Sequence, residues 1–261
     1  NCRVEFIRPM YDLNQPAVGR INSALQRFEP MKTIGLLGGM SWESTVSYYQ
    51  AINEGVKAAL GGLHSAKLCI YSLDFAEIES LQRSSDWQAT AEILARAAQS
   101  VEAAGAEFLV FCTNTMHKVA AEVQSAITIP LLHIADATGR RLRADGVSRV
   151  GLLGTRFTMA EEFYKARLEN DFAIDVLVPD AAHQNIVHEV IYTELCLGRI
   201  SRHSRQQYLE IIDALHARGA EAVILGCTEI ALLVQQQHTP VPLYDTTAIH
   251  AARAVEIALG G

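Results

Sequence analysis

The chain has 261 residues, of which 49% are hydrophobic and 20% are charged, and this composition excludes an intrinsically disordered protein. The formal net charge is −7 and no block of Lys and Arg interrupts the acidic balance, so we expect no nucleic-acid partner. No apolar stretch reaches the roughly 18 residues that a membrane helix needs, so we expect no membrane association.

Residues 1–30 differ from the rest of the chain, because they contain Pro9, Pro16 and Pro30 and show no sustained hydrophobic period. They also lack the long apolar core of a signal peptide. We expect this segment to be an N-terminal extension outside the fold, which would begin at Met31.

After this segment, short apolar runs alternate with stretches of helical period. Several runs are apolar throughout, which is typical of parallel strands covered on both faces. The predicted strands are residues 33–37, 67–73, 107–112, 130–133, 148–153, 173–178, 221–226 and 241–244. Apolar spacing of three and four residues predicts helices over 45–60, 86–104 and 204–218, and a capping-box pattern at Thr158–Glu161 predicts the start of another.

The chain also contains an internal repeat. Ile-Gly-Leu-Leu-Gly at 34–38 returns as Val-Gly-Leu-Leu-Gly at 150–154, and residues 105–113 return at 219–227. The matches occur in the same order at nearly the same spacing, which favours two similar units over chance. We therefore predict an α/β fold of two pseudo-symmetric domains, each a four-stranded parallel sheet flanked by helices. The expected boundaries are residues 31–134 plus 247–261 for the first domain and 135–246 for the second.

Two strand ends carry the candidate reactive groups. The repeat aligns Thr113 with Cys227, each directly after an apolar run. Because ligands of parallel sheets bind beyond the carboxyl ends of the strands, we expect both residues in one cleft between the domains. A helix start after Cys227 would lower its thiol pKa from about 8.5 toward neutrality. Cys112 is the alternative to Thr113, since neighbouring strand residues point to opposite faces.

For several other candidate residues, a purely structural role is an alternative to a functional one. The loop Gly39-Met40-Ser41 follows a strand and precedes a helix, so it either offers backbone N–H groups to an anion or is simply a tight turn. Lys165 and Arg83 are candidate ligands of a substrate carboxylate, although a solvated surface suits either side chain. His117 is either a catalytic acid or a packed histidine.

The number and spacing of the cysteines limit the kinds of site that the chain can form and indicate the compartment in which it acts. Five are present, an odd number, and no Cys-x-x-Cys pair occurs, so the sequence favours neither a disulfide framework nor a zinc site. Free thiols are typical of the cytoplasm, where we expect the protein to act. Cys69 and Cys196 are expected to be packed in the core.

Three motifs together carry a family resemblance. They are Gly-Gly-Met-Ser at 38–41, Asn-Thr-Met-His at 114–117 and Gly-Cys-Thr-Glu at 226–229. This set, spread over about residues 31–260, resembles the aspartate/glutamate racemase family. The resemblance implies no metal or other cofactor, two pseudo-symmetric domains, frequent dimerisation, and two cysteines on opposite sides of the substrate α-carbon. Thr113 stands where the first cysteine is expected, which is similar to an atypical Thr/Cys branch of that family.

The resemblance implies racemisation of acidic amino acids, aspartate and glutamate first. Racemisation needs one group to remove the α-proton and another to deliver a proton to the opposite face. We expect Cys227 to take the proton from the L-enantiomer and Thr113 to act on the other face, because a Thr hydroxyl is far harder to ionise. Charge on the substrate carboxylate would be stabilised by Asn114, Thr115, Thr228 and the amides of Gly39 and Met40.

The expected partners are a small-molecule amino acid and a second copy of the chain in a homodimer. Two alternatives remain open: a broad-specificity amino-acid racemase, and a catalytically weak amino-acid-binding protein that lost turnover with one cysteine. A nucleotide-binding protein is disfavoured, because no Lys-Ser/Thr pair follows the glycine loop.

Overall fold

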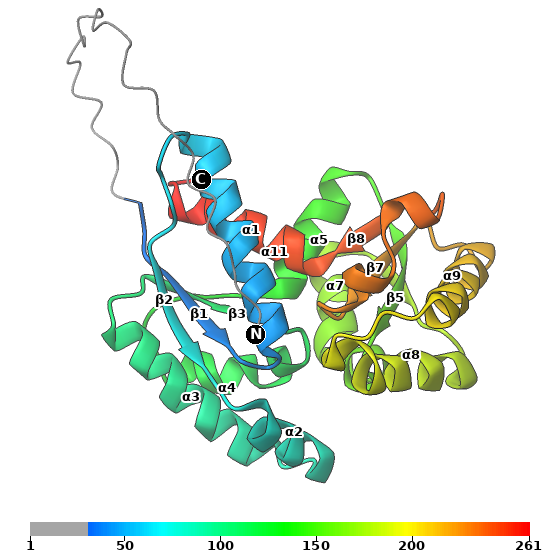
Figure 1. Cartoon of the computed structure of the whole chain (residues 1–261), viewed down its shortest axis with the longest axis horizontal. Coiled ribbons are helices and arrows are strands. Elements are labelled where there is room, and N and C mark those ends of the chain that lie inside the picture. The colour runs from blue at the N-terminus through cyan, green and yellow to red at the C-terminus, as the bar shows by residue number, and fades with distance from the viewer. Residues whose placement is uncertain (1–30) are drawn as a thin grey trace, which may run out of the picture.

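The computed structural model describes residues 31–261, so the predicted extension over residues 1–30 lies outside the described part of the chain. The described residues form two α/β halves that lie side by side (Figure 1). None of their helices is long and apolar enough to cross a bilayer.

Each half is built on one parallel four-stranded sheet. The first sheet contains β1 (Ile34–Gly38), β2 (Leu68–Ser72), β3 (Phe108–Phe111) and β4 (Leu131–Leu132), in the order β2-β1-β3-β4. The second contains β5 (Arg149–Gly154), β6 (Asp175–Leu177), β7 (Ala222–Gly226) and β8 (Leu243–Asp245), in the order β6-β5-β7-β8. All eight predicted strands and the predicted fold class are confirmed.

The register of the central strands follows the repeat. Leu37 of β1 pairs with Phe111 of β3, and Leu153 of β5 pairs with Leu225 of β7. These strands are almost entirely buried, because helices cover both faces of each sheet. The position two residues beyond Phe111 in one half therefore corresponds to the position two residues beyond Leu225 in the other.

Helices fill the intervals between the strands. In the first half they are α1 (Trp42–Leu60), α2 (Phe75–Ser84), α3 (Trp87–Ala103), the 3-10 turn η1 (Thr115–Val119) and α4 (Ala120–Ser125), and α5 (Ile134–Ala144) follows at the junction of the halves. The later ones are α6 (Arg156–Ala160), α7 (Glu162–Phe172), α8 (Ala181–Thr193), η2 (Leu195–Leu197), α9 (Arg202–Ala217), α10 (Ile230–Leu233), η3 (Gln236–His238) and α11 (Thr246–Ala258). The predicted helices over 45–60, 86–104 and 204–218 correspond to α1, α3 and α9.

The capping box predicted at Thr158 is wrong. Thr158 lies inside the short helix α6, whose N-cap is Thr155: the Thr155 Oγ1 accepts the Thr158 N–H at 3.3 Å. The next helix, α7, begins at Glu162 after a break at Glu161, where the backbone is extended. The Thr-x-x-Glu pattern at residues 158–161 therefore does not cap α7, because Thr158 belongs to the preceding helix α6.

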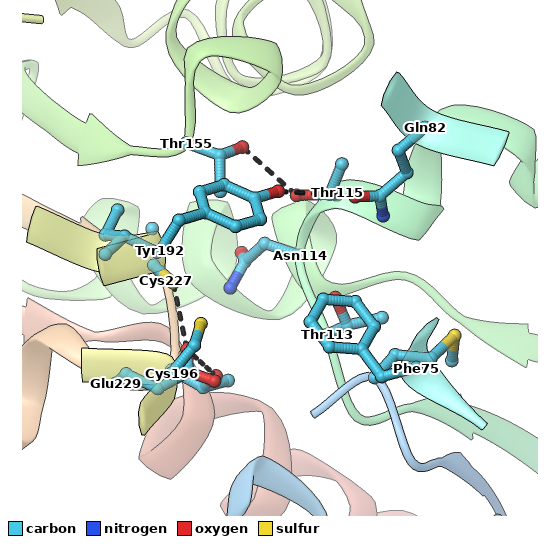
Figure 2. Close-up of a pocket in the computed structure, with 14 residues that line it drawn as sticks. Phe75, Gln82, Thr113, Asn114, Thr115, Thr155, Tyr192, Cys196, Cys227 and Glu229 are labelled. Carbon is cyan, nitrogen blue, oxygen red and sulfur yellow. Dashed lines mark hydrogen bonds between the residues drawn. The ribbon is translucent and has the colours of Figure 1, made fainter. Parts of the chain in front are cut away.

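Two helices join the halves. α11 runs from the second sheet and packs on α1, where Ala251 and Val255 share a buried cluster with Tyr48 and Ile52. α5 packs on α11 and on α7, and its Ile134 joins the core of the second half. The carboxyl ends of both sheets consequently face one cavity between the halves (Figure 2).

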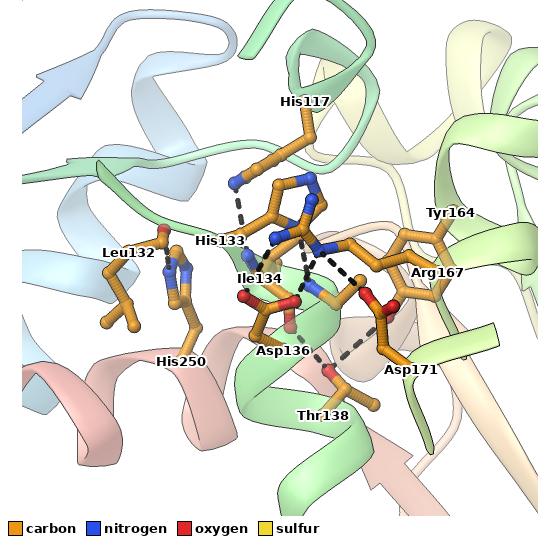
Figure 3. Close-up of polar contacts among 11 residues, drawn as sticks. His117, Leu132, His133, Ile134, Asp136, Thr138, Tyr164, Arg167, Asp171 and His250 are labelled. Carbon is orange, nitrogen blue, oxygen red and sulfur yellow. Dashed lines mark hydrogen bonds and ion pairs between the residues drawn. The ribbon is translucent and has the colours of Figure 1, made fainter. Parts of the chain in front are cut away.

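Three buried histidines lie at the start of α5, next to this junction (Figure 3). The ring of His117 lies 4.5 Å from that of His133 and 5.8 Å from that of His250, centre to centre. His117 Nε2 accepts the Ile134 N–H at 3.2 Å, and His133 Nδ1 accepts the Ala135 N–H at 3.1 Å as the N-cap of α5. These acceptor roles require neutral rings.

Burial keeps all three rings neutral. It lowers the pKa of His133 to about 3 and that of His250 to about 4, and it lowers the pKa of His117 well below the ordinary value, with a further contribution from the other two rings. Unfolding below about pH 6.5 therefore binds protons that the native protein excludes. Stability is fully present above this pH and is lost as the pH falls toward the folded values.

We predict a steep acid dependence of stability. With three protons bound on unfolding, the free energy of unfolding should fall by up to about 4 kcal/mol per pH unit below pH 6. Urea titrations between pH 7.5 and 5 measure this slope. His250→Gln should lower the slope by about one proton, with His203→Gln as the surface control. A slope unaffected by His250→Gln would refute the assignment.

Candidate active site

A cavity with an empty volume of about 390 Å³ lies between the carboxyl ends of the two sheets. Residues of both halves line it, so neither half forms it alone. They are Met40, Phe75, Gln82, Thr113, Asn114, Thr115, Thr155, Ile191, Tyr192, Cys196, Gly226, Cys227, Thr228 and Glu229.

The structure brings Thr113 and Cys227 to this one cavity, as the repeat predicts. Thr113 comes just after β3 and Cys227 just after β7, and in Figure 2 they lie on opposite sides of the cavity. Both are largely buried, with 8% and 9% of their surfaces exposed. A small ligand between them would meet a hydroxyl on one side and a thiol on the other.

A buried carboxylate organises the Cys227 side. Glu229 Oε2 accepts a hydrogen bond from Cys227 Sγ at 2.9 Å and one from Thr228 Oγ1 at 2.7 Å. Its Oε1 accepts from Ser41 Oγ at 2.8 Å and Ser44 Oγ at 2.9 Å, both at the N-terminus of α1 in the other half. Ser44 Oγ also contacts the Thr228 hydroxyl. The carboxylate therefore links the two halves at the cavity wall.

The thiol of Cys227 is protonated in this arrangement. Burial raises its pKa well above the ordinary value, and the negative charge of Glu229 and the neighbouring Cys196 raise it further. The predicted lowering of the Cys227 pKa by the helix start is not observed, because burial and the Glu229 charge outweigh it. A proton on the sulfur also fits the hydrogen bond that Sγ donates to Glu229. The cavity thus holds a thiol whose hydrogen bond is accepted, at 2.9 Å, by the Glu229 carboxylate.

Asn114 has an unused acceptor in the cavity wall. Its Nδ2 donates to Thr246 Oγ1 at 3.1 Å, and Thr246 Oγ1 in turn donates a hydrogen bond to the Leu225 carbonyl at 2.9 Å. Asn114 Oδ1 is buried and has no hydrogen-bond partner among the described residues. A buried unpaired oxygen is costly, so a ligand that donates a hydrogen bond to this atom would relieve that cost.

The glycine loop enters the site only in part. Met40 lines the cavity, whereas Gly39 and Ser41 do not. The Gly39 N–H donates to Thr45 Oγ1 at 2.8 Å, so it is not free for an anion. Gly39 has a φ of +85°, and a Cβ there would lie 2.2 Å from the Leu73 carbonyl oxygen, so the tight-turn interpretation applies to it.

Arg83 and Lys165 do not reach this cavity. Arg83 lies at the end of α2 with 79% of its side chain exposed and pairs with Glu79 at 2.5 Å. Lys165 pairs with Glu162 one turn earlier on α7, at 2.8 Å. Each cation pairs with a glutamate of its own helix, so the prediction that Arg83 and Lys165 point into this cavity is wrong.

The other residues singled out in the sequence lie either in the cavity wall or away from it. Cys112 is fully buried against α1 and α11 and does not line the cavity, which leaves Thr113 at the strand end. Cys196 was expected in the core but lines the cavity from η2. Cys69 is half-buried in β2 and its Sγ lies 3.3 Å from the Ala104 carbonyl. His117 is the packed histidine of the two alternatives.

Sequence reasoning missed several lining residues. Glu229 stands beside Cys227 in the Gly-Cys-Thr-Glu motif, so its proximity was visible although its role was not. Gln82 and Tyr192 come from α2 and α8, and Tyr192 Oη donates to Gln82 Oε1 at 3.2 Å across the two halves. No local pattern marks them, because this pair forms only by tertiary contact. Within residues 31–261, no group of three or more His, Cys, Asp or Glu side chains could hold a metal ion.

Two solved structures are similar to this chain over most of its length. A crystal structure of a Yersinia pestis protein assigned to the Asp/Glu racemases is 54% identical, covers 88% of this chain and 100% of its own, and superposes with a TM-score of 0.83. An aspartate racemase homologue from Pyrococcus horikoshii is 34% identical, with coverage of 87% and 99% and a TM-score of 0.77.

A relative of this chain in sequence is named for an amino-acid racemase activity. The broad-specificity amino-acid racemase RacX of Bacillus subtilis is 21% identical over 85% of this chain and 96% of its own length. The sequence model of the Asp/Glu/hydantoin racemase family matches residues 37–254. The chain therefore belongs to the Asp/Glu/hydantoin racemase family, and the prediction of an amino-acid racemase is confirmed at this level.

Proposed function

We propose that this protein racemises acidic amino acids, aspartate and glutamate first, without a cofactor, using Cys227 and Thr113 on opposite faces of the α-carbon. The observation that carries the proposal is that both side chains line one small cavity from equivalent strand ends of the two halves. A single base would return the proton to the face it left, so two opposed groups suit inversion.

Glu229 supplies the means to use a buried thiol as a base. The thiolate is the reactive form, and the free site holds the thiol. We propose that Glu229 accepts the Cys227 proton along the hydrogen bond that joins the two side chains. The thiolate then removes the α-proton of the L-enantiomer.

Thr113 acts on the other face in this proposal. An alkoxide is inaccessible near neutral pH, so its hydroxyl donates or relays a proton instead of starting the abstraction. The Asn114 Oδ1 that lacks a partner accepts from the substrate ammonium. Thr115, Thr228 and the backbone around Met40 lie where hydroxyl and N–H groups can stabilise charge building on the substrate carboxylate.

A broad-specificity amino-acid racemase is the second candidate. Among residues 31–261, no Lys or Arg side chain lines the reaction cavity, so nothing in it pairs with an acidic side chain directly. The Bacillus subtilis relative carries this activity in its name. A catalytically weak binding protein, the third alternative, would bind amino acids without exchanging their α-hydrogen.

We also propose that the protein acts in the cytoplasm as a homodimer on a small-molecule substrate. Four free cysteines among the described residues suit a reducing compartment. Trp42, Val46 and Tyr49 lie at helical spacing on the outer face of α1 and are 64%, 52% and 51% exposed, which supports an apolar contact with a second copy.

For the exchange chemistry, we expect Cys227→Ser to lower α-deuterium incorporation from L-glutamate or L-aspartate in D₂O by about 10²–10⁴-fold, because the abstracting base is lost. The wild-type protein should incorporate deuterium faster from L- than from D-enantiomers, and Thr113→Cys should raise the D-side rate. Cys69→Ser is the control. Equal wild-type rates from both enantiomers would contradict the assignment of the two faces.

For the carboxylate, Glu229→Gln should lower turnover while it makes Cys227 easier to ionise, because the neutral amide removes a charge that raises the thiol pKa. Alkylation of Cys227 by iodoacetamide, followed by peptide mass analysis, should therefore begin at lower pH in the variant. Glu221→Gln, at an exposed position, is the control. An unchanged or upward-shifted alkylation profile would argue against the coupling.

For the assembly, Val46→Glu should convert a dimer to a monomer, because it places a charge in the apolar contact. Sedimentation velocity measures the change, and Glu54→Gln on an exposed part of α1 is the control. A wild-type protein that sediments as a monomer at high concentration would reject the homodimer.

A further inference from the structure

A second cavity adjoins the reaction cavity. This outer cavity has an empty volume of about 1020 Å³ and shares exactly two lining residues with the reaction cavity, Gln82 and Tyr192. The hydrogen bond of 3.2 Å between them connects α2 of one half to α8 of the other. In Figure 2 the hydroxyl of Tyr192 points toward Gln82. They form the partition between the two cavities.

The outer cavity contains the cations that the reaction cavity lacks. Arg83 and Arg156 both line it. The Arg83 guanidinium is already bound twice to Glu79, at 2.5 and 3.1 Å. Arg156 makes no ion pair with any described residue, and its Nη2 only donates to Asn185 Oδ1 at 3.2 Å. A guanidinium without a carboxylate keeps donors available for one.

The neighbours of Arg156 do not supply a better cation. His188 Nδ1 accepts the Arg156 backbone N–H at 3.2 Å, and burial together with the Arg156 charge lowers the pKa of His188, so the ring is neutral near pH 7. Glu189 also lines the outer cavity, but no ion pair joins it to Arg156. Arg156 therefore remains the available charge on this wall.

Chain connectivity places Arg156 directly behind the reaction cavity. It follows Thr155, whose side chain lines the reaction cavity and bonds Thr115 at 3.1 Å. Gln82 and Tyr192 line both cavities, so they lie between the site of Cys227 and Thr113 and the cavity that Arg156 lines.

We propose that Arg156 binds the side-chain carboxylate of an acidic amino-acid substrate, reached through the partition formed by Gln82 and Tyr192. This inference rests on the proposed racemase function and names the residue that sets its preference for acidic side chains. It also explains how a reaction cavity without a cation serves an acidic substrate.

The test compares substrates of equal shape and different charge. Rates of α-hydrogen exchange in D₂O are measured for L-glutamate against L-glutamine and for L-aspartate against L-asparagine. In the wild type, kcat/KM should favour the acid, and Arg156→Gln should reduce the acid-to-amide ratio by about tenfold or more, mainly through KM for the acid. Arg156→Lys should restore part of the ratio. Arg140→Gln, at another exposed arginine without an ion pair, should leave it unchanged.

The outcomes separate this inference from the function on which it rests. An acid-to-amide ratio that stays the same in Arg156→Gln overturns the role of Arg156, as does loss of the ratio in Arg83→Gln alone. A wild type that exchanges acids and amides equally also overturns it, while racemisation itself would stand. No α-hydrogen exchange with any amino acid would instead remove the proposed function.

Discussion

The buried carboxylate of Glu229 is the interaction on which the site depends. Taking an ionised carboxylate out of water costs several kcal/mol unless hydrogen bonds replace the lost hydration. Here the donors come from both halves, two serines from the start of α1 and the thiol and hydroxyl that follow β7. Satisfying this one group therefore fixes the distance between the halves and the direction of the Cys227 sulfur together.

The two halves use the same scaffold for unequal chemistry. The repeat aligns Thr115 with Glu229, and each bonds the loop that follows the first strand of the other half: Thr115 to Thr155, and Glu229 to Ser41. Cross-bonding thus follows the pseudo-symmetry, while the groups themselves do not. One side has a thiol beside a carboxylate and the other a hydroxyl beside a hydroxyl, so a division of labour between the two faces is built into the walls.

The strands and the two strand-end residues could be predicted because they depend on local apolar runs and on the repeat. Strand alternation left Cys112 as the alternative to Thr113, and the burial of Cys112 away from the cavity leaves Thr113 at the strand end. Arg83 could not be placed, since a long side chain on a helix follows its nearest partner, here Glu79. Cys196 looked like a core residue because the short turn η2, which directs it to the cavity, has no periodic signal. The Gln82–Tyr192 contact joins residues 110 positions apart, beyond any local pattern.

The packed imidazole of His117 has a mechanical consequence. Its Nδ1–H points to the Asn114 carbonyl at 3.3 Å, and its Nε2 holds the first amide of α5 at 3.2 Å. The ring therefore links the loop that carries Thr113 to the N-terminus of α5, the helix that packs between the halves. A displacement of α5 would therefore carry the Thr113 loop with it, because the two are joined through one imidazole ring.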